Sequence, residues 1–218
     1  MKKLILASLL LSLTSFSSLA TLYTTTWNSG FANAGAVPDN NLSGWIDSRL
    51  TDAAPAGTVQ IGSVAVTLNL SGGWNGDLYA YLVNSSSGFS VLLDRVGQGE
   101  SGVSAFGYGD AGMNVTLAAT GTSIQQYGGN STFTAPPTGT WMTDNTSGSL
   151  GSFTTQNGTW SLFIADLSGG GISTVQSWGL QMDIVAVPEV EAWVAAALAG
   201  AFGAFWLNRQ MFSRKPRG

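Results

Sequence analysis

The apolar and polar positions between residues 21 and 187 follow the pattern of short β-strands. Apolar side chains alternate with polar ones in two clear sets: Val64, Val66, Leu68 and Leu70, and then Trp178, Leu180, Met182 and Ile184. Because successive side chains of a strand point to opposite faces, each set predicts one buried strand face. Val59 and Ile61 are out of phase with the first set, which predicts a bulge near Gly62 and Ser63.

Turn-forming residues separate further apolar runs. Leu78–Val83 and Ser90–Leu93 are joined by the polar residues 84–88, which predicts a hairpin, and Trp160–Ile164 forms another apolar run. No helical heptad pattern interrupts residues 21–187. Many short strands at this spacing predict an all-β domain, a β-sandwich or jelly roll.

The N-terminal residues have the pattern of an export signal. Lys2 and Lys3 precede the apolar run Leu4–Leu13, and a more polar stretch follows that closes on Ser18-Leu19-Ala20, with small residues at the positions that signal peptidase requires. This pattern predicts a signal peptide over residues 1–20, which signal peptidase would cleave between Ala20 and Thr21. The same run as a permanent anchor is the alternative, but it is short for a spanning helix.

Residues 192–207 form an uncharged apolar run of the kind found in membrane helices. As a helix it would be about 24 Å long at ~1.5 Å per residue, against ~30 Å for the hydrocarbon core, so it spans only marginally. Trp193 and Trp206 lie near its ends, and the cations that follow favour the cytoplasmic side. An amphipathic surface helix is the alternative, but the run has no polar face. The bulk of the chain is therefore expected outside the cytoplasm.

Residues 188–218 resemble a known sorting signal. Val187-Pro188-Glu189, the apolar run and a basic tail with Arg214, Lys215 and Arg217 are similar to the tripartite PEP-CTERM signal of Gram-negative bacteria. The third motif residue, usually Pro, is Val190 here. The resemblance implies a membrane-held intermediate in the inner membrane, processing near Pro188-Glu189 by an exosortase-type enzyme, and delivery to the cell surface or the medium.

The composition of residues 21–187 excludes several functions. Two arginines, Arg49 and Arg95, stand against ten acidic residues, a formal charge of 2 − 10 = −8, so nucleic acid would be repelled. The chain has no cysteine and no histidine, and this region has no lysine. Zinc sites with His or Cys ligands, Ser-His-Asp triads, cysteine nucleophiles and Schiff-base chemistry are thereby excluded. A non-enzyme is predicted, and a glycoside hydrolase using Asp77 and Asp166 is the less favoured alternative.

Spaced motifs between Val37 and Ile184 resemble the P domain, the β-jelly-roll module that accompanies subtilisin-like proprotein convertases. The motifs are Val37-Pro38-Asp39-Asn40, Gly76-Asp77-Leu78, Gly158-Thr159-Trp160 and Trp178-Gly179-Leu180. The family often has a His before its Gly-Asp-Leu strand, and this chain has none. Gly97–Gly151 matches least and is expected to be an insertion with long loops. Without a protease domain beside it, the resemblance implies the scaffold and not the chemistry.

Three residues are candidates for ligand contacts. Asp77 precedes a predicted strand and Asp166 ends one, so the two carboxylates are hypothesised to hold a structural calcium ion. The alternative is that they cap turns. Trp74 lies in a predicted loop and is the candidate for stacking on a sugar, or else it packs over a neighbouring loop. Trp27, Trp45 and Trp141 also fall in turn-rich stretches, whereas Trp160 and Trp178 are predicted to be core.

These observations together predict an exported, non-catalytic protein of the cell surface or extracellular matrix, with a structural, adhesive or exopolysaccharide-associated role. The alternative is a stand-alone carbohydrate-binding module. The expected partners are the export machinery, the processing enzyme and the membrane, and calcium is the one cofactor considered.

Overall fold

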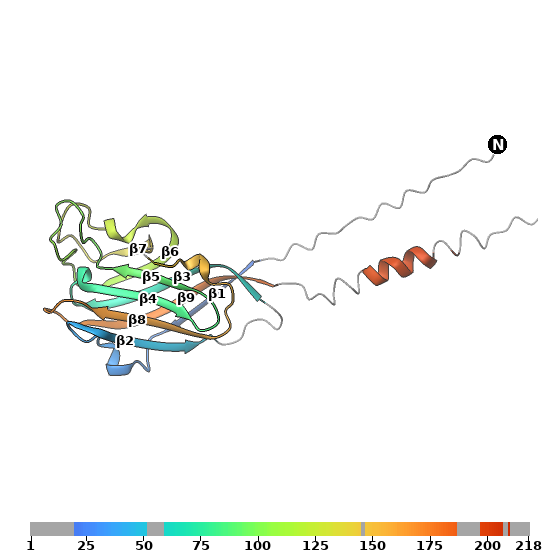
Figure 1. Ribbon diagram of the computed structural model, residues 1–218, viewed down its shortest axis with the longest axis horizontal. Helices are drawn as coiled ribbons and strands as arrows, with labels where there is room; N and C mark the ends of the chain where they lie inside the picture. The colour runs from blue at the N-terminus through green and yellow to red at the C-terminus, as the bar shows by residue number, and fades with distance from the viewer. Residues whose placement is uncertain (1–19, 52–58, 145–146, 187–196, 207–208, 210–218) are drawn as a thin grey trace, which may run out of the picture.

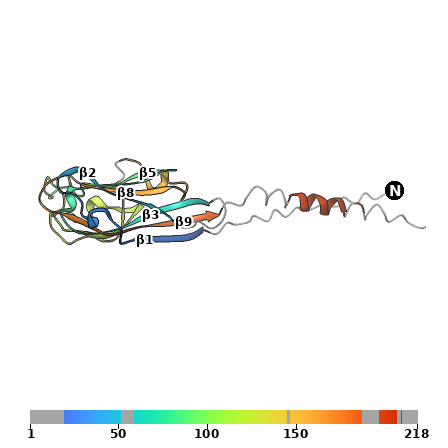
Figure 2. The same cartoon turned by 90° about the horizontal axis from the view of Figure 1, so that it is seen from below.

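The computed structural model describes residues 20–51, 59–144, 147–186, 197–206 and 209. Within these residues two β-sheets lie face to face as two layers (Figures 1 and 2). The five-stranded sheet has the order β1-β9-β3-β6-β7, and the four-stranded sheet has the order β2-β8-β4-β5. The prediction of an all-β sandwich is confirmed.

The strands of the five-stranded sheet are β1 (Ala20–Trp27), β3 (Val59–Gly72), β6 (Met113–Ser123), β7 (Thr138–Met142) and β9 (Ser173–Ala186). Those of the four-stranded sheet are β2 (Asn41–Leu50), β4 (Leu78–Asn84), β5 (Phe89–Asp94) and β8 (Thr159–Asp166). Short 3₁₀ turns η1 (Ala32–Gly35), η2 (Asn75–Asp77), η3 (Ile124–Gln126) and η4 (Leu150–Ser152) lie in the connections.

The core lies between the sheets and is built by the alternation seen in the sequence. The inward residues of β3 and β9 are at most 4% exposed, and Trp160 and Trp178 are fully buried. The pairing of β3 with β9 shifts between Ile61 and Ser63, which confirms the predicted bulge. The hairpin of β4 and β5 is also confirmed.

The sandwich has two distinct ends. At one end β1 begins and β9 finishes, because Ala20 pairs with Val185 across the sheet. We call this the terminus end, and it lies to the right in Figure 1. At the other end β2, β4 and β9 begin and β8 finishes, and the backbone N–H of Val37 bonds to the carbonyl of Ser173. We call this the loop end.

The segment Gly97–Gly151, expected to consist of long loops, also contributes the two strands β6 and β7, which pair in parallel. Its loops are held by buried side chains. The Tyr108 hydroxyl donates to the carbonyl of Gly129 at 3.0 Å, and Asp110 accepts from the backbone N–H of Thr134 at 2.8 Å. The segment is therefore an integral part of the sandwich.

The predicted targeting segments lie largely outside the described residues, as do Pro188, Glu189, Arg214, Lys215 and Arg217. Ala20 and Thr21 are the first residues of β1. Residues 197–206 are helical, and Leu198, Phe202, Phe205 and Trp206 are 53–71% exposed. In the part of the chain that the structure describes, no helix meets the length and hydropathy needed to cross a membrane.

Candidate functional site

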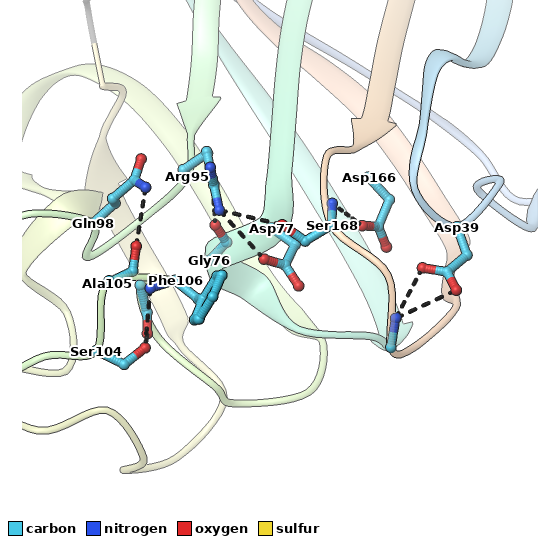
Figure 3. A network of polar contacts seen from close by, with 12 residues as sticks. Asp39, Gly76, Asp77, Arg95, Gln98, Ser104, Ala105, Phe106, Asp166 and Ser168 are labelled. Atoms are coloured by element: carbon cyan, nitrogen blue, oxygen red, sulfur yellow. Dashed lines mark hydrogen bonds and ion pairs between the residues drawn. The ribbon is translucent and has the colours of Figure 1, made fainter.

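The two aspartates singled out from the sequence meet at the loop end, as Figure 3 shows. β4 and β8 are antiparallel neighbours, and Leu78 pairs with Asp166. Because Asp77 directly precedes Leu78, the pairing places both carboxylates at the same end of these two neighbouring strands. The backbone N–H of Leu167 also donates to the carbonyl of Asp77 at 2.9 Å, which joins the two segments. The structure thus brings Asp77 and Asp166 to the same end of two neighbouring strands.

Asp77 is 6% exposed and lies beside the Arg95 guanidinium, with Nη2 at 3.7 Å from Asp77 Oδ1. Arg95 is itself held in place, because its Nε donates to the Gly76 carbonyl and its Nη2 to the Ser168 hydroxyl, each at 3.3 Å. Burial raises the pKa of Asp77, while the Ser168 hydroxyl and then Arg95 counteract this rise. The positive charge of Arg95 thus does not fully offset the cost of removing the Asp77 carboxylate from water.

Asp166 is fully buried and has weaker compensation. Its Oδ1 accepts the backbone N–H of Ser168 at 3.2 Å, whereas its Oδ2 is buried without a hydrogen-bond partner. Burial raises the pKa of Asp166 to about 6, and the negative charges of Asp77 and Asp39 add to the rise. A carboxyl group in this setting gives up its proton only near neutral pH.

Asp39 is the third carboxylate of this loop end, which sequence reasoning did not select. It is exposed, and its Oδ1 and Oδ2 accept the backbone N–H of Gly170 at 3.2 and 3.4 Å. The signal that identifies it is its place in Val37-Pro38-Asp39-Asn40, one of the motifs used for the family resemblance. Asp39 joins the loop before β2 to the loop after β8.

The donor atoms here are of the kind that calcium prefers. Asp77 Oδ1 and Asp166 Oδ2 are buried oxygens without hydrogen-bond partners, and hard oxygen ligands suit Ca²⁺. Against this, Arg95 already neutralises part of the charge, and the described residues contain no group of three or more acidic, His or Cys side chains placed to hold a metal ion. The calcium site stays a prediction, and the bond from the Ser168 N–H to Asp166 Oδ1 fits the alternative that Asp166 caps a turn.

Trp74 does not stand free in its loop. Its ring packs edge-on against Phe133, with centroids 5.1 Å apart, and its Nε1 is buried without a hydrogen-bond partner. The alternative that it packs over a neighbouring loop is therefore the one the structure favours. Trp27, Trp45 and Trp141, which fall in turn-rich stretches of the sequence, lie on the strands β1, β2 and β7. Gly, Ser and Asn residues near them in the sequence are typical of turns, so the strand pattern could not be recognised there.

A second feature, which sequence reasoning missed, is a row of aromatic side chains on the outer face of the four-stranded sheet. We call the residues Tyr79, Tyr81, Phe89 and Phe163 the aromatic row. Tyr81 and Phe163 stack with centroids 4.7 Å apart and planes at 17°. Phe89 and Tyr79 lie 5.3 and 6.3 Å from Tyr81. The signal in the sequence was aromatic residues at the outward positions of an alternating strand, where polar residues are usual.

The surroundings of the aromatic row are uncharged over most of its length. Ile46, paired with Phe163, extends it onto β2 and is 53% exposed. Beside it the hydroxyl groups of Ser48 and Ser161 bond to each other at 2.7 Å. Among the described residues a carboxylate adjoins one end of the row, where Asp94 pairs with Tyr79. All four side chains are half-buried, and each ring contacts at least one other ring of the row.

No family model matches the chain, and no curated protein matches it either. Among solved structures, the chain is similar to the serine protease of Aeromonas sobria, alone and in complex with its chaperone, at 16% identity and a TM-score of 0.44. The similarity covers 76% of this chain and 27% of the protease for the protease alone, and 78% and 28% for the complex with the chaperone. The chain therefore spans little more than a quarter of the protein it resembles.

Proposed function

We propose that this chain is an exported, non-catalytic β-sandwich that binds extracellular polysaccharide through its aromatic row. The observation that carries the proposal is the row itself: four aromatic rings on the outward side of a sheet, in mutual contact and only half-buried. Aromatic residues on a solvent-facing sheet leave apolar surface in water, and such surface commonly marks a binding site.

Polysaccharide is the ligand class that this surface suits best. The C–H groups of a pyranose ring pack on aromatic faces through apolar and weak C–H contacts. The hydroxyl groups of Ser48 and Ser161 lie beside the rings and offer hydrogen bonds to sugar hydroxyls. The near absence of charge among the described residues of this surface favours a neutral, hydroxyl-rich ligand over nucleic acid or a charged peptide.

The buried state of the carboxylate pair supports a binding role over hydrolysis. A glycosidase needs two carboxyl groups in contact with its substrate, about 5 to 10 Å apart. Asp77 and Asp166 are 6% and 0% exposed, so a sugar chain has no access to them in this conformation. The lack of histidine and cysteine leaves few other catalytic groups.

The rest of the proposal concerns the route and the family. The signal peptide and the PEP-CTERM-like segment would export the chain, hold it at the inner membrane and release it to the surface after processing near Pro188-Glu189. The P-domain resemblance is supported by the location of its motifs, since Asp39, Asp77 and Asp166 meet at the loop end. In this view the chain carries the P-domain scaffold as a binding module.

The test is polysaccharide binding by the purified protein, measured as retention on cellulose and chitin and as retardation in gels containing soluble α- or β-glucans. Tyr81→Ala and Phe163→Ala are each expected to weaken binding by about fivefold or more, the equivalent of ~1 kcal/mol for one aromatic contact. Phe106→Ala is the matched control, because Phe106 is an exposed aromatic residue at the loop end, away from the row. Thermal unfolding of each variant shows whether the fold is kept.

Two results would contradict the proposal. One is a wild-type protein that none of these polysaccharides retains. The other is binding that Trp74→Ala reduces and Tyr81→Ala leaves unchanged, which would move the contact surface to the loop around Trp74.

A further inference from the structure

We propose that the terminus end of the sandwich faces the lipid surface while the chain is membrane-held, and that the loop end with its carboxylates points away from it. This inference rests on the proposed sorting route, because it needs residues 192–207 to be in the membrane. It adds an orientation, and with it an interaction surface, to that route.

The first step is the position of the two domain ends. β1 and β9 are antiparallel neighbours, and Ala20 pairs with Val185. The predicted cleavage site between Ala20 and Thr21 and the strand end at Ala186 therefore lie side by side. Both segments assigned to the membrane leave the domain from the same end of the same sheet. The chain can be held at one or both of these points without changing which end faces the bilayer.

The second step compares the connecting segment with the size of the domain. From Ala186 to Ala192 the chain can extend at most about 20 Å, at ~3.3–3.6 Å per residue. β9 has 14 residues and at ~3.3 Å per residue runs about 45 Å from one end of the sandwich to the other. A connection that short does not allow the domain to turn its loop end to the bilayer. The terminus end is kept near the lipid surface by geometry alone.

The third step is charge. The described acidic residues of the domain lie mostly at the loop end, where they are Asp39, Asp77, Asp94, Glu100, Asp110, Asp144 and Asp166. The remaining two are Asp47, bonded to Arg49, and Asp183, bonded to Ser63. Bacterial membranes carry anionic lipids, which repel carboxylates within a Debye length of about 8–10 Å. Charge thus favours the same orientation as the connecting segment.

The fourth step concerns the helix of residues 197–206. Its large apolar side chains Leu198, Phe202, Phe205 and Trp206 are 53–71% exposed, so the described sandwich does not cover them. A lipid surface is the occupant that removes this apolar area from water. This helix follows the connecting segment and would hold the terminus end close to the lipid.

One strand supplies a matched pair of reporters. Leu50 and Leu42 lie near opposite ends of β2 and are 68% and 80% exposed. Leu50 belongs to the terminus end, as two hydrogen bonds show. The hydroxyl of the next residue, Thr51, donates to the carbonyl of Gln156. Two residues before Gln156, the carbonyl of Thr154 accepts the N–H of Ile61, which lies near the start of β3 at the terminus end. Leu42 belongs to the loop end, because Asn41 pairs with Asp166. Leu22, 65% exposed, gives a second position at the terminus end.

The chain has no cysteine, so single cysteines can be labelled without background. The full chain carrying Leu50→Cys, Leu22→Cys or Leu42→Cys is labelled with a fluorophore and bound to vesicles of phosphatidylethanolamine and phosphatidylglycerol. A fraction of the lipids carries a nitroxide quencher on the headgroup. We expect quenching at positions 50 and 22 to be several-fold stronger than at position 42. Vesicles without the nitroxide quencher give the reference fluorescence, and flotation gives the fraction of protein bound to vesicles.

The outcomes separate the orientation from the sorting route. If the chain floats with the vesicles but position 42 is quenched as strongly as position 50, the orientation is wrong and the membrane segment stands. If the chain does not float with the vesicles, the membrane role of residues 192–207 fails, and the orientation fails with it. Stronger quenching at positions 50 and 22 supports both.

Discussion

The substitution Asp166→Asn tests the electrostatics of the loop end. Asp166 is fully buried, has one carboxylate oxygen without a hydrogen-bond partner, and lies near Asp77. Asparagine keeps the size of the side chain and an oxygen that can accept the N–H of Ser168, and it removes the negative charge. The variant therefore imitates the protonated form of Asp166.

The sign of the effect follows from the pKa. Burial, followed by the charges of Asp77 and Asp39, raises the pKa of Asp166 from 3.8 to about 6 in the folded protein. Between these values the folded state holds a proton that the unfolded state has released, so the free energy of unfolding falls as pH rises through about 4 to 6. Above about pH 6 the loss is complete. At ~1.4 kcal/mol for each pH unit the full loss is at most about 3 kcal/mol, and residual solvation reduces it to about 1–3 kcal/mol.

The assay is thermal and denaturant unfolding of wild type and Asp166→Asn between pH 4 and 8. We expect the wild type to lose stability from about pH 4 to 6, the variant to lose less, and the variant to be the more stable by about 1–3 kcal/mol at pH 7. In a domain of this size each kcal/mol corresponds to about 2–4 °C in Tm. A variant that is less stable than wild type at pH 7 would refute this reasoning, since Asp166 would then be stabilising as an anion.

Calcium gives the same variant a second use. If Ca²⁺ binds between Asp77 and Asp166, it binds the deprotonated pair, so added Ca²⁺ should raise the Tm of the wild type at pH 7 and leave Asp166→Asn unchanged. An equal shift in both proteins would place the ion elsewhere. No shift in the wild type would remove the calcium hypothesis.

Substitutions at Asp47 and Gly179, with Asp183→Ala for comparison, test how the sandwich is held together. Asp47→Ala removes the acceptor of the buried Trp178 Nε1–H, at 2.7 Å, and of Arg49 Nε, also at 2.7 Å, and should cost about 1–3 kcal/mol in denaturant unfolding. Asp183→Ala, which removes only an exposed bond to Ser63, should cost less than about 1 kcal/mol, and equal costs would contradict the role given to Asp47. Gly179→Ala places a Cβ 2.2 Å from the carbonyl oxygen of Thr25. It should push β1 away from β9 and lower the free energy of unfolding by about 1–3 kcal/mol. Faster hydrogen exchange confined to β1 would show this, and unchanged β1 protection would argue against it.

The sequence predicts the central strands well and the edge strands poorly, for a physical reason. β3 and β9 have one face in the core, so their alternation and even the bulge near Gly62 can be read directly. β1 is an edge strand with three consecutive threonines, Thr24–Thr26, and only some of its side chains reach the core. β7 has five residues and pairs in parallel with β6 across a long loop, a pairing that no local pattern reveals.

The candidate site shows the same division. Strand ends could be located from local patterns, and this sufficed to bring Asp77 and Asp166 together. The contribution of Asp39 depends on a contact between two loops whose residues, Asp39 and Gly170, lie 131 positions apart in the sequence. The aromatic row depends on three strands being neighbours in the order β8-β4-β5. Periodicity shows that Tyr79 and Tyr81 point outward, and only the sheet order shows that Phe163 and Phe89 lie on either side of Tyr81.

The position of β9 connects the fold with the proposed export route. β9 is the last strand among the described residues, yet it lies between β1 and β3 inside the five-stranded sheet and carries the buried Trp178. The sheet therefore cannot close until residues as far as Ala186 are available for pairing, and β1 has no partner strand before that point. A domain built in this way stays incomplete while its C-terminal part is still being translocated. If the chain is exported as proposed, completion of the fold would coincide with arrival of the segment after Ala186 at the membrane.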